Sequence, residues 1–153
     1  MKLVGIGERM SLVKDSTVRL WRTLMPRRNE IVNRVTSSYI SMRVYSKPGM
    51  PANEMFAPDT EFDKWSAVEV ADHGSIPEGM HAYSLAGGMY AIFVHTGLAS
   101  KFPDTMRYIF DTWLPQSGYM LGDREQFEVI PEGWSPSDEQ AREDIFLPIR
   151  KAT

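Results

Sequence analysis

The chain has 153 residues, of which 42% are hydrophobic and 24% are charged, so it can build a packed core and is not expected to be disordered. Its formal net charge of −3, without a basic run, argues against nucleic acid or an anionic membrane as the main partner. The chain contains no cysteine, which excludes a disulfide framework, a thiol nucleophile and a cysteine-ligated zinc site. The N-terminus does not resemble a signal peptide, and no segment approaches the roughly 18 apolar residues of a membrane span. We therefore expect a cytoplasmic protein.

The first half of the chain predicts a strand, a helix and two further strands. They are expected at residues 2–10, 14–28, 39–46 and 64–72, respectively. Asp15 or Ser16 is a suitable N-cap for the helix, and Pro26 should end or kink it. Four prolines and glycines in close order predict a loop over residues 46–61.

The second half repeats this order. A strand, a helix and two strands are expected at residues 87–97, 102–118, 125–131 and 144–151, respectively. We therefore predict one α+β domain over residues 1–153, made of two βαββ units at about residues 1–72 and 87–150. Both helices are expected on one face of an antiparallel sheet, with a ligand groove on the other face.

Glu128 lies in the apolar strand QFEVI, where an unpaired buried carboxylate would be costly. Because strand side chains alternate, Phe127 and Val129 are assigned to the helix side and Glu128 to the open face. An offset of 89 residues, obtained by matching Pro26 to Pro115, sets Tyr39 opposite Glu128. The same argument assigns further aromatic side chains to this open face, namely Tyr45, Trp65, Phe146 and Trp134.

Aromatic rings around a carboxylate are suited to a flat organic cation. The rings offer apolar area and the negative face of their quadrupole, while the carboxylate supplies the opposite charge. Met42 or Met55 could serve as adaptable contacts. The alternative is that Glu128 is simply solvated, or that it pairs with Arg43.

Four segments of the second half, taken together, resemble a known family. GGMYAIFVHTG, FPDTMRYIFDTWLPQSGY, QFEVIPEG and EDIFLPIRK follow one another in the order and spacing of the GyrI-like small-molecule-binding domain. This domain is also the effector-binding domain of AraC-type and MerR-type multidrug regulators. The resemblance implies a duplicated βαββ fold with a ligand groove, and it implies that Glu128 contacts cationic, lipophilic drugs. The first βα unit uses the residues before Tyr39, so no helix-turn-helix module is expected there.

The first hypothesis is therefore a stand-alone binding protein for a lipophilic cation, without a cofactor and without direct contact to nucleic acid. A second is a hydrolase of small electrophiles in which Glu128 is the general base. A third is a protein-interaction module that binds a topoisomerase or a separate regulator, and the aromatic face could also form a homodimer. No metal site is expected, because no histidine pair has a ligand spacing; the histidines are His73, His81 and His95.

Overall fold

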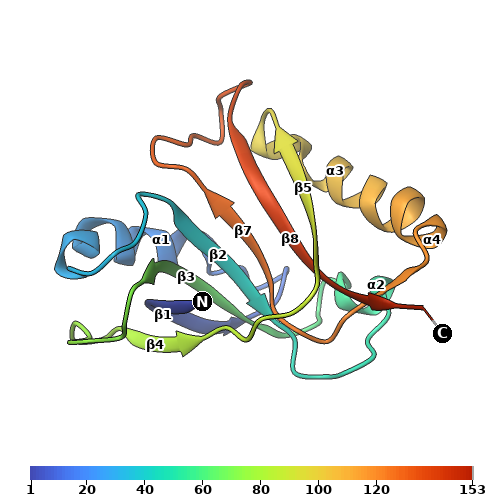
Figure 1. Cartoon of the computed structure of the whole chain (residues 1–153). Coiled ribbons are helices and arrows are strands. Elements are labelled where there is room, and N and C mark those ends of the chain that lie inside the picture. Colours follow the sequence, from blue (N-terminus) through green and yellow to red (C-terminus); the bar gives the residue numbers. More distant parts are fainter. Residues whose placement is uncertain (153) are drawn as a thin grey trace.

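The structure, a computed structural model, describes residues 1–152 (Figure 1). Its strands are β1 (Lys2–Met10), β2 (Tyr39–Val44), β3 (Phe62–Val70), β4 (His81–Ser84), β5 (Tyr90–Thr96), β6 (Tyr119–Leu121), β7 (Gln126–Ile130) and β8 (Arg142–Lys151). Its α-helices are α1 (Thr17–Leu24), α2 (Ala52–Met55), α3 (Phe102–Tyr108) and α4 (Leu114–Gln116). Two 3-10 turns, η1 (Met25–Glu30) and η2 (Ala99–Lys101), and a π-helical turn, η3 (Ile109–Trp113), complete the elements.

The strands form one antiparallel sheet in the order β4-β1-β3-β2-β7-β8-β5, and β6 pairs with β8 beside this path. The two βαββ units therefore meet where β2 pairs with β7, which confirms the predicted α+β class. In this pairing Tyr39 lies opposite Ile130 and Ser41 lies opposite Glu128. Adding 89 to Tyr39 and Ser41 gives Glu128 and Ile130, so the two pairs are equivalent positions of the repeat.

Helix α1 begins and ends as its sequence predicts. The Asp15 carboxylate accepts a hydrogen bond of 2.8 Å from the backbone N–H of Thr17, whereas Ser16 makes no side-chain cap bond. Pro26 is the second residue of η1, so the regular helix gives way to a tighter turn where a proline removes a backbone donor. Leu20 and Leu24 are the residues that α1 buries.

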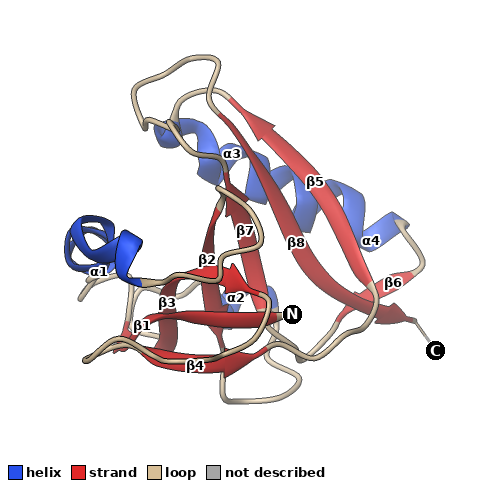
Figure 2. Cartoon of the chain, turned by 60° about the vertical axis from the view of Figure 1, so that its left-hand side comes forward, coloured by secondary structure: helices blue, strands red, loops and turns tan. Residues whose placement is uncertain are grey.

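Both helical segments pack on the same face of the sheet. Ser66, Ser41, Glu128 and Ile145 stand in one row across β3, β2, β7 and β8. Ile145 packs with Ile109 of η3, and Val68, two residues from Ser66, packs with Leu24 of α1. Because side chains two apart on a strand share a face, the face of Glu128 is the helix side. Figure 2 shows the arrangement, with α1 beside β1 and β3 and the α3–α4 segment along β8 and β5.

The prediction that Glu128 points away from the helices is therefore wrong. The next row across the sheet holds Trp65, Met42, Phe127 and Phe146, and it lies on the far face. Trp65 and Phe146 thus do not share the face of Glu128, and Phe127 does not pack under a helix.

The far face is covered by the chain itself. It holds a second apolar cluster that includes Leu3, Met42, Phe127 and Leu85, with Tyr83 of β4 and Tyr90 of β5 packed against it. The rings of Phe127 and Phe146 are stacked with centroids 4.6 Å apart, and Trp65 contacts Tyr83 edge-on at 5.3 Å. Since this face is also apolar, an apolar side chain on β2 or β7 does not by itself identify the helix side.

Three short elements were not expected from the sequence. Strand β4 follows the turn-rich connection after β3, and β6 follows the long helical segment. Helix α2 lies inside the stretch 46–61, which was predicted to be a loop throughout.

Candidate functional site

A hollow of about 640 Å³, here called the larger chamber, lies on the helix side of the sheet. Its wall is built from β1, β2 and β3 on one side and from α3 and η3 on the other. The apolar residues that line it include Met10, Phe56, Phe62, Phe102, Met106 and Phe110. Charged side chains, Arg43 and Lys64, reach it from the strands. This hollow therefore lies on the same face as the helices, and not on the opposite face, where the ligand groove was predicted.

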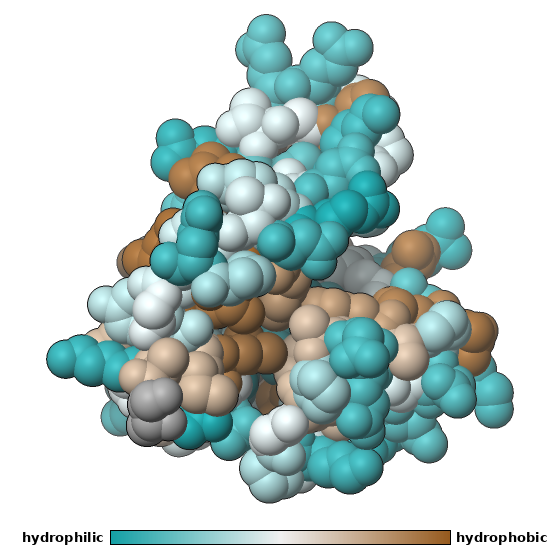
Figure 3. All heavy atoms as spheres, turned by 90° about the vertical axis from the view of Figure 1, so that its right-hand side faces the viewer, coloured by the Kyte–Doolittle hydropathy of each residue, from teal (hydrophilic) through white to brown (hydrophobic). Residues whose placement is uncertain are grey.

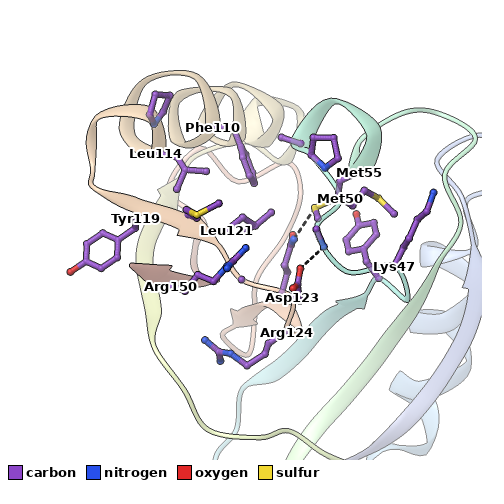
Figure 4. Close-up of a pocket in the computed structure, with 18 residues that line it drawn as sticks. Lys47, Met50, Met55, Phe110, Leu114, Tyr119, Leu121, Asp123, Arg124 and Arg150 are labelled. Atoms are coloured by element: carbon purple, nitrogen blue, oxygen red, sulfur yellow. Dashed lines mark hydrogen bonds between the residues drawn. The ribbon is translucent and has the colours of Figure 1, made fainter. Parts of the chain in front are cut away.

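A second hollow of about 460 Å³, here called the smaller chamber, lies between α2, the end of the long helical segment and β6 (Figure 4). Its apolar wall includes Met50, Phe110, Leu114 and Leu121. The backbone N–H of Gly49 donates a hydrogen bond of 2.7 Å to the Asp123 carboxylate, which ties the loop before α2 to the turn before β7.

The two chambers are adjacent parts of one groove, because both are lined by Tyr45, Ala52 and Phe110. Phe56, which follows α2, contacts Phe110 edge-on with ring centroids 4.9 Å apart. Helix α2 and this ring pair therefore divide the groove. Seen from the side of α4 and the C-terminal strand, apolar side chains gather in a hollow edged by hydrophilic ones (Figure 3).

Arg43 and Glu128 form a buried ion pair at the floor of the groove. Two hydrogen bonds join the guanidinium to the carboxylate, at 2.7 and 2.8 Å, and the side chains are only 11% and 6% exposed. Burial alone would lower the pKa of Arg43, but the charge and hydrogen bonds of Glu128 outweigh it and raise this pKa. Arg43 lines the larger chamber and Glu128 does not, so Arg43 is the member of the ion pair that reaches the hollow.

Two further ionisable side chains are buried beside this pair. Burial, with a smaller contribution from Arg43, lowers the pKa of Lys64 to about 8. Burial and the charge of Glu128 raise the pKa of Glu143 to about 7, although Arg43 and Lys64 act in the opposite direction. The floor of the groove therefore holds two bases and two acids, and two of the four have a pKa close to neutrality.

The structure separates the six residues predicted for the site. Tyr45 lines both chambers and packs on Phe62 with ring centroids 5.1 Å apart. Tyr39 is on the helix side but is buried under α1, edge-on to Trp21. Trp65 and Phe146 belong to the far face, and Trp134 lies in the turn after β7, where it lines neither chamber. Of the predicted set, only Glu128 and Tyr45 are in or directly beneath the groove.

Sequence reasoning missed Lys64 and most of the apolar wall. Strand alternation does carry a signal for Lys64, because Val68 was expected under a helix and Lys64 lies four residues before it on the same strand. Phe56 and Met106 reach the chamber only because a loop and a helix from different halves of the chain meet there. No residue spacing within the sequence predicts that these two segments lie together.

Within residues 1–152 no three His, Asp or Glu side chains come together as a metal site would require. His95 is held by Thr105, whose hydroxyl lies 2.6 Å from Nδ1, and by the carbonyl of Leu98, 3.1 Å from Nε2. None of the helices in this part of the chain is both long enough and apolar enough to cross a membrane.

The family follows from the sequence as a whole. The model of the GyrI-like small molecule binding domain matches residues 1–150. The chain belongs to this family. The chain is therefore a small-molecule-binding domain. No curated protein matches the sequence.

Solved structures show the same fold at low sequence identity. SAV2435 bound to tetraphenylphosphonium superposes with a TM-score of 0.72 at 15% identity, over 98% of this chain and 88% of that chain. A putative bacterial transcription regulation protein from Staphylococcus aureus MU50 gives 0.67 at 15% identity, over 98% and 92%. EcmrR in a complex with DNA gives 0.72 at 14% identity, over 99% of this chain and 54% of the EcmrR chain. This GyrI-like chain thus shares its fold with SAV2435 and with part of the EcmrR chain.

Proposed function

We propose that this GyrI-like chain binds amphiphilic organic cations in the groove, with Glu128 as the counter-charge and Tyr45 as part of the aromatic wall. One observation carries the proposal. A buried carboxylate lies under an apolar hollow, and its charge is balanced by a single guanidinium that itself lines that hollow. The binding of tetraphenylphosphonium by SAV2435, which has the same fold, supports this ligand class.

The bound cation would compete with Arg43 for Glu128. Arg43 is attached through a flexible stem, so its guanidinium can leave the carboxylate while an aromatic cation takes its place. Breaking the ion pair consumes part of the binding free energy, because both charges are desolvated. Affinity should therefore be modest, and it should depend strongly on which partner of the pair is present.

The two partners of the pair provide a matched test. Arg43→Met and Glu128→Gln both break the same ion pair, but they change the charge of the floor in opposite directions. We expect Arg43→Met to bind tetraphenylphosphonium about tenfold more tightly than wild type and Glu128→Gln to bind it about tenfold more weakly, each tenfold step corresponding to about 1.4 kcal/mol. Isothermal titration calorimetry measures both, after circular dichroism has confirmed that each variant is folded.

Tetraphenylborate, which has the same shape and the opposite charge, is the control ligand. Arg43→Met should bind tetraphenylborate more weakly than wild type, and Glu128→Gln should bind it more tightly. If both variants change the affinity for the cation in the same direction, the counter-charge role of Glu128 is excluded, because loss of packing alone does not depend on the sign of the charge.

The structure favours binding over the hydrolytic alternative. A general base needs a lone pair that is free to take a proton from a water or a substrate. Glu128 lines neither chamber and both of its oxygens accept hydrogen bonds from Arg43, so its neighbour in this structure is Arg43 and not a group that faces the hollow.

A further inference from the structure

Lys64 is a largely buried side chain whose ammonium group has no protein partner among the described residues. It lies on the helix side of β3, is only 7% exposed and lines the larger chamber. Its cross-strand neighbours are Glu8 on β1 and Arg43 on β2. Both neighbours are engaged elsewhere, Glu8 with Arg19 and Arg43 with Glu128. Within residues 1–152, Lys64 Nζ has neither a hydrogen bond nor an ion pair.

A buried charge without a partner is costly, and proteins rarely retain one unless it is used. The other charged groups that act on Lys64 do not remove its need for a partner. Arg43 repels it, while Glu128, Asp15 and Glu143 attract it from outside ion-pair distance. With a pKa of about 8, the amine is still mostly protonated at neutral pH. What the site lacks is an anion within contact of Nζ.

The surroundings of Lys64 define the rest of the ligand. The chamber that Lys64 lines has an apolar wall that includes Met10, Phe62, Met106 and Phe110, and it also has charged lining residues, among them Asp15, Arg107 and Asp111. Its volume of about 640 Å³ is within the range of roughly 300–1,000 Å³ that small-molecule sites have. A small inorganic anion would leave this apolar wall uncovered, whereas an acid with a hydrocarbon body would cover it.

We propose that Lys64 is the anion-binding group of the larger chamber and pairs with the carboxylate of a lipophilic acid whose apolar body lies against Phe62, Met106 and Phe110. The proposal uses the same groove as the proposed cation site but a different charged residue. A carboxylate on Lys64 does not require Arg43 to leave Glu128, so this ligand enters without breaking the buried ion pair.

Decanoate and decanol test the proposal, because they share a chain and differ in the acid group. Calorimetric titration of the wild-type protein should show decanoate binding at least tenfold more tightly than decanol. In Lys64→Met the decanoate affinity should fall at least tenfold while that of decanol is unchanged, and Lys64→Arg should restore a preference for decanoate. Lys14→Met, which removes an exposed lysine, should behave as wild type.

Equal binding of decanoate and decanol to the wild-type protein would overturn the proposal without any variant. An equal loss in Lys64→Met and Lys14→Met would also overturn it, because the acid would then respond only to overall charge. Tetraphenylphosphonium separates this inference from the proposed function. If its affinity still responds in opposite directions to Arg43→Met and Glu128→Gln while decanoate does not bind, only the role of Lys64 fails.

Discussion

The two faces of the central strands differ sharply, although both are buried. On the helix side, β2, β3 and β7 present Arg43, Lys64 and Glu128. On the far face the same strands present Met42, Ala67 and Phe127, all within one apolar cluster. The far face has the apolar composition of a core, whereas the helix side buries charged side chains as well. Such a local departure from a stable arrangement is typical of a binding site.

The largest effect on stability should come from a substitution on the far face. Phe127→Ala removes a ring that is 2% exposed and stacked on Phe146, so we expect the free energy of unfolding to fall by about 3–5 kcal/mol. Urea unfolding followed by tryptophan fluorescence measures it. Ile92→Ala, at a side chain that is 58% exposed, is the control and should change stability by less than about 0.5 kcal/mol. If Phe127→Ala lowered the free energy of unfolding by less than about 1 kcal/mol, packing on the far face would not be a main source of stability.

On the helix side, a substitution should raise the free energy of unfolding instead of lowering it. Lys64→Met removes the cost of a buried ammonium and should stabilise the protein by roughly 2 kcal/mol at pH 7. Because folding lowers the pKa of Lys64 from 10.5 to about 8, the wild-type protein gains stability as the pH rises through this interval, and the advantage of the variant should shrink. Urea unfolding at pH 7 and pH 10 measures both. If Lys64→Met were less stable than wild type at pH 7, the ammonium of Lys64 would not destabilise the folded protein.

The smallest effect should come from Glu143, which lies on the same face as Ile145. Folding raises its pKa from 4.5 to about 7, so the folded state holds this proton more tightly and the wild-type protein loses stability as the pH rises through that range. Glu143→Gln cannot ionise and should be about 1 kcal/mol more stable than wild type at pH 8, and equal to it at pH 4. Thermal unfolding at the two pH values measures it. A difference that does not depend on pH would exclude the titration of Glu143 as its cause.

Much of the architecture could be predicted from the sequence. The order of the βαββ units, the antiparallel sheet and the offset of 89 residues that relates Tyr39 to Glu128 all correspond to the structure. Local periodicity and proline positions were sufficient, because they reflect the backbone of each element alone. The alternation within every central strand was also correct.

The assignment of faces failed for β2 and β7. It rested on the rule that apolar side chains of a sheet face the helices, whereas here Phe127 and Met42 pack into the far cluster instead. Only the register with β3 and β8 decides which face is which, and register is a relation between strands that neither strand encodes alone. The pairing of Arg43 with Glu128 was left open for the same reason, since 85 residues separate them.

The contact between Phe56 and Phe110 has a consequence for rates. For the proposed binding in the groove, we expect a ligand that fits one chamber to enter and leave without moving this ring pair, and a ligand long enough to occupy both chambers to part the two rings first. Its association then contains an opening step inside the protein, so the observed rate stops rising at high ligand concentration. Dissociation waits for the same opening. We therefore expect residence times in the groove to differ with ligand length, even where the affinities are equal.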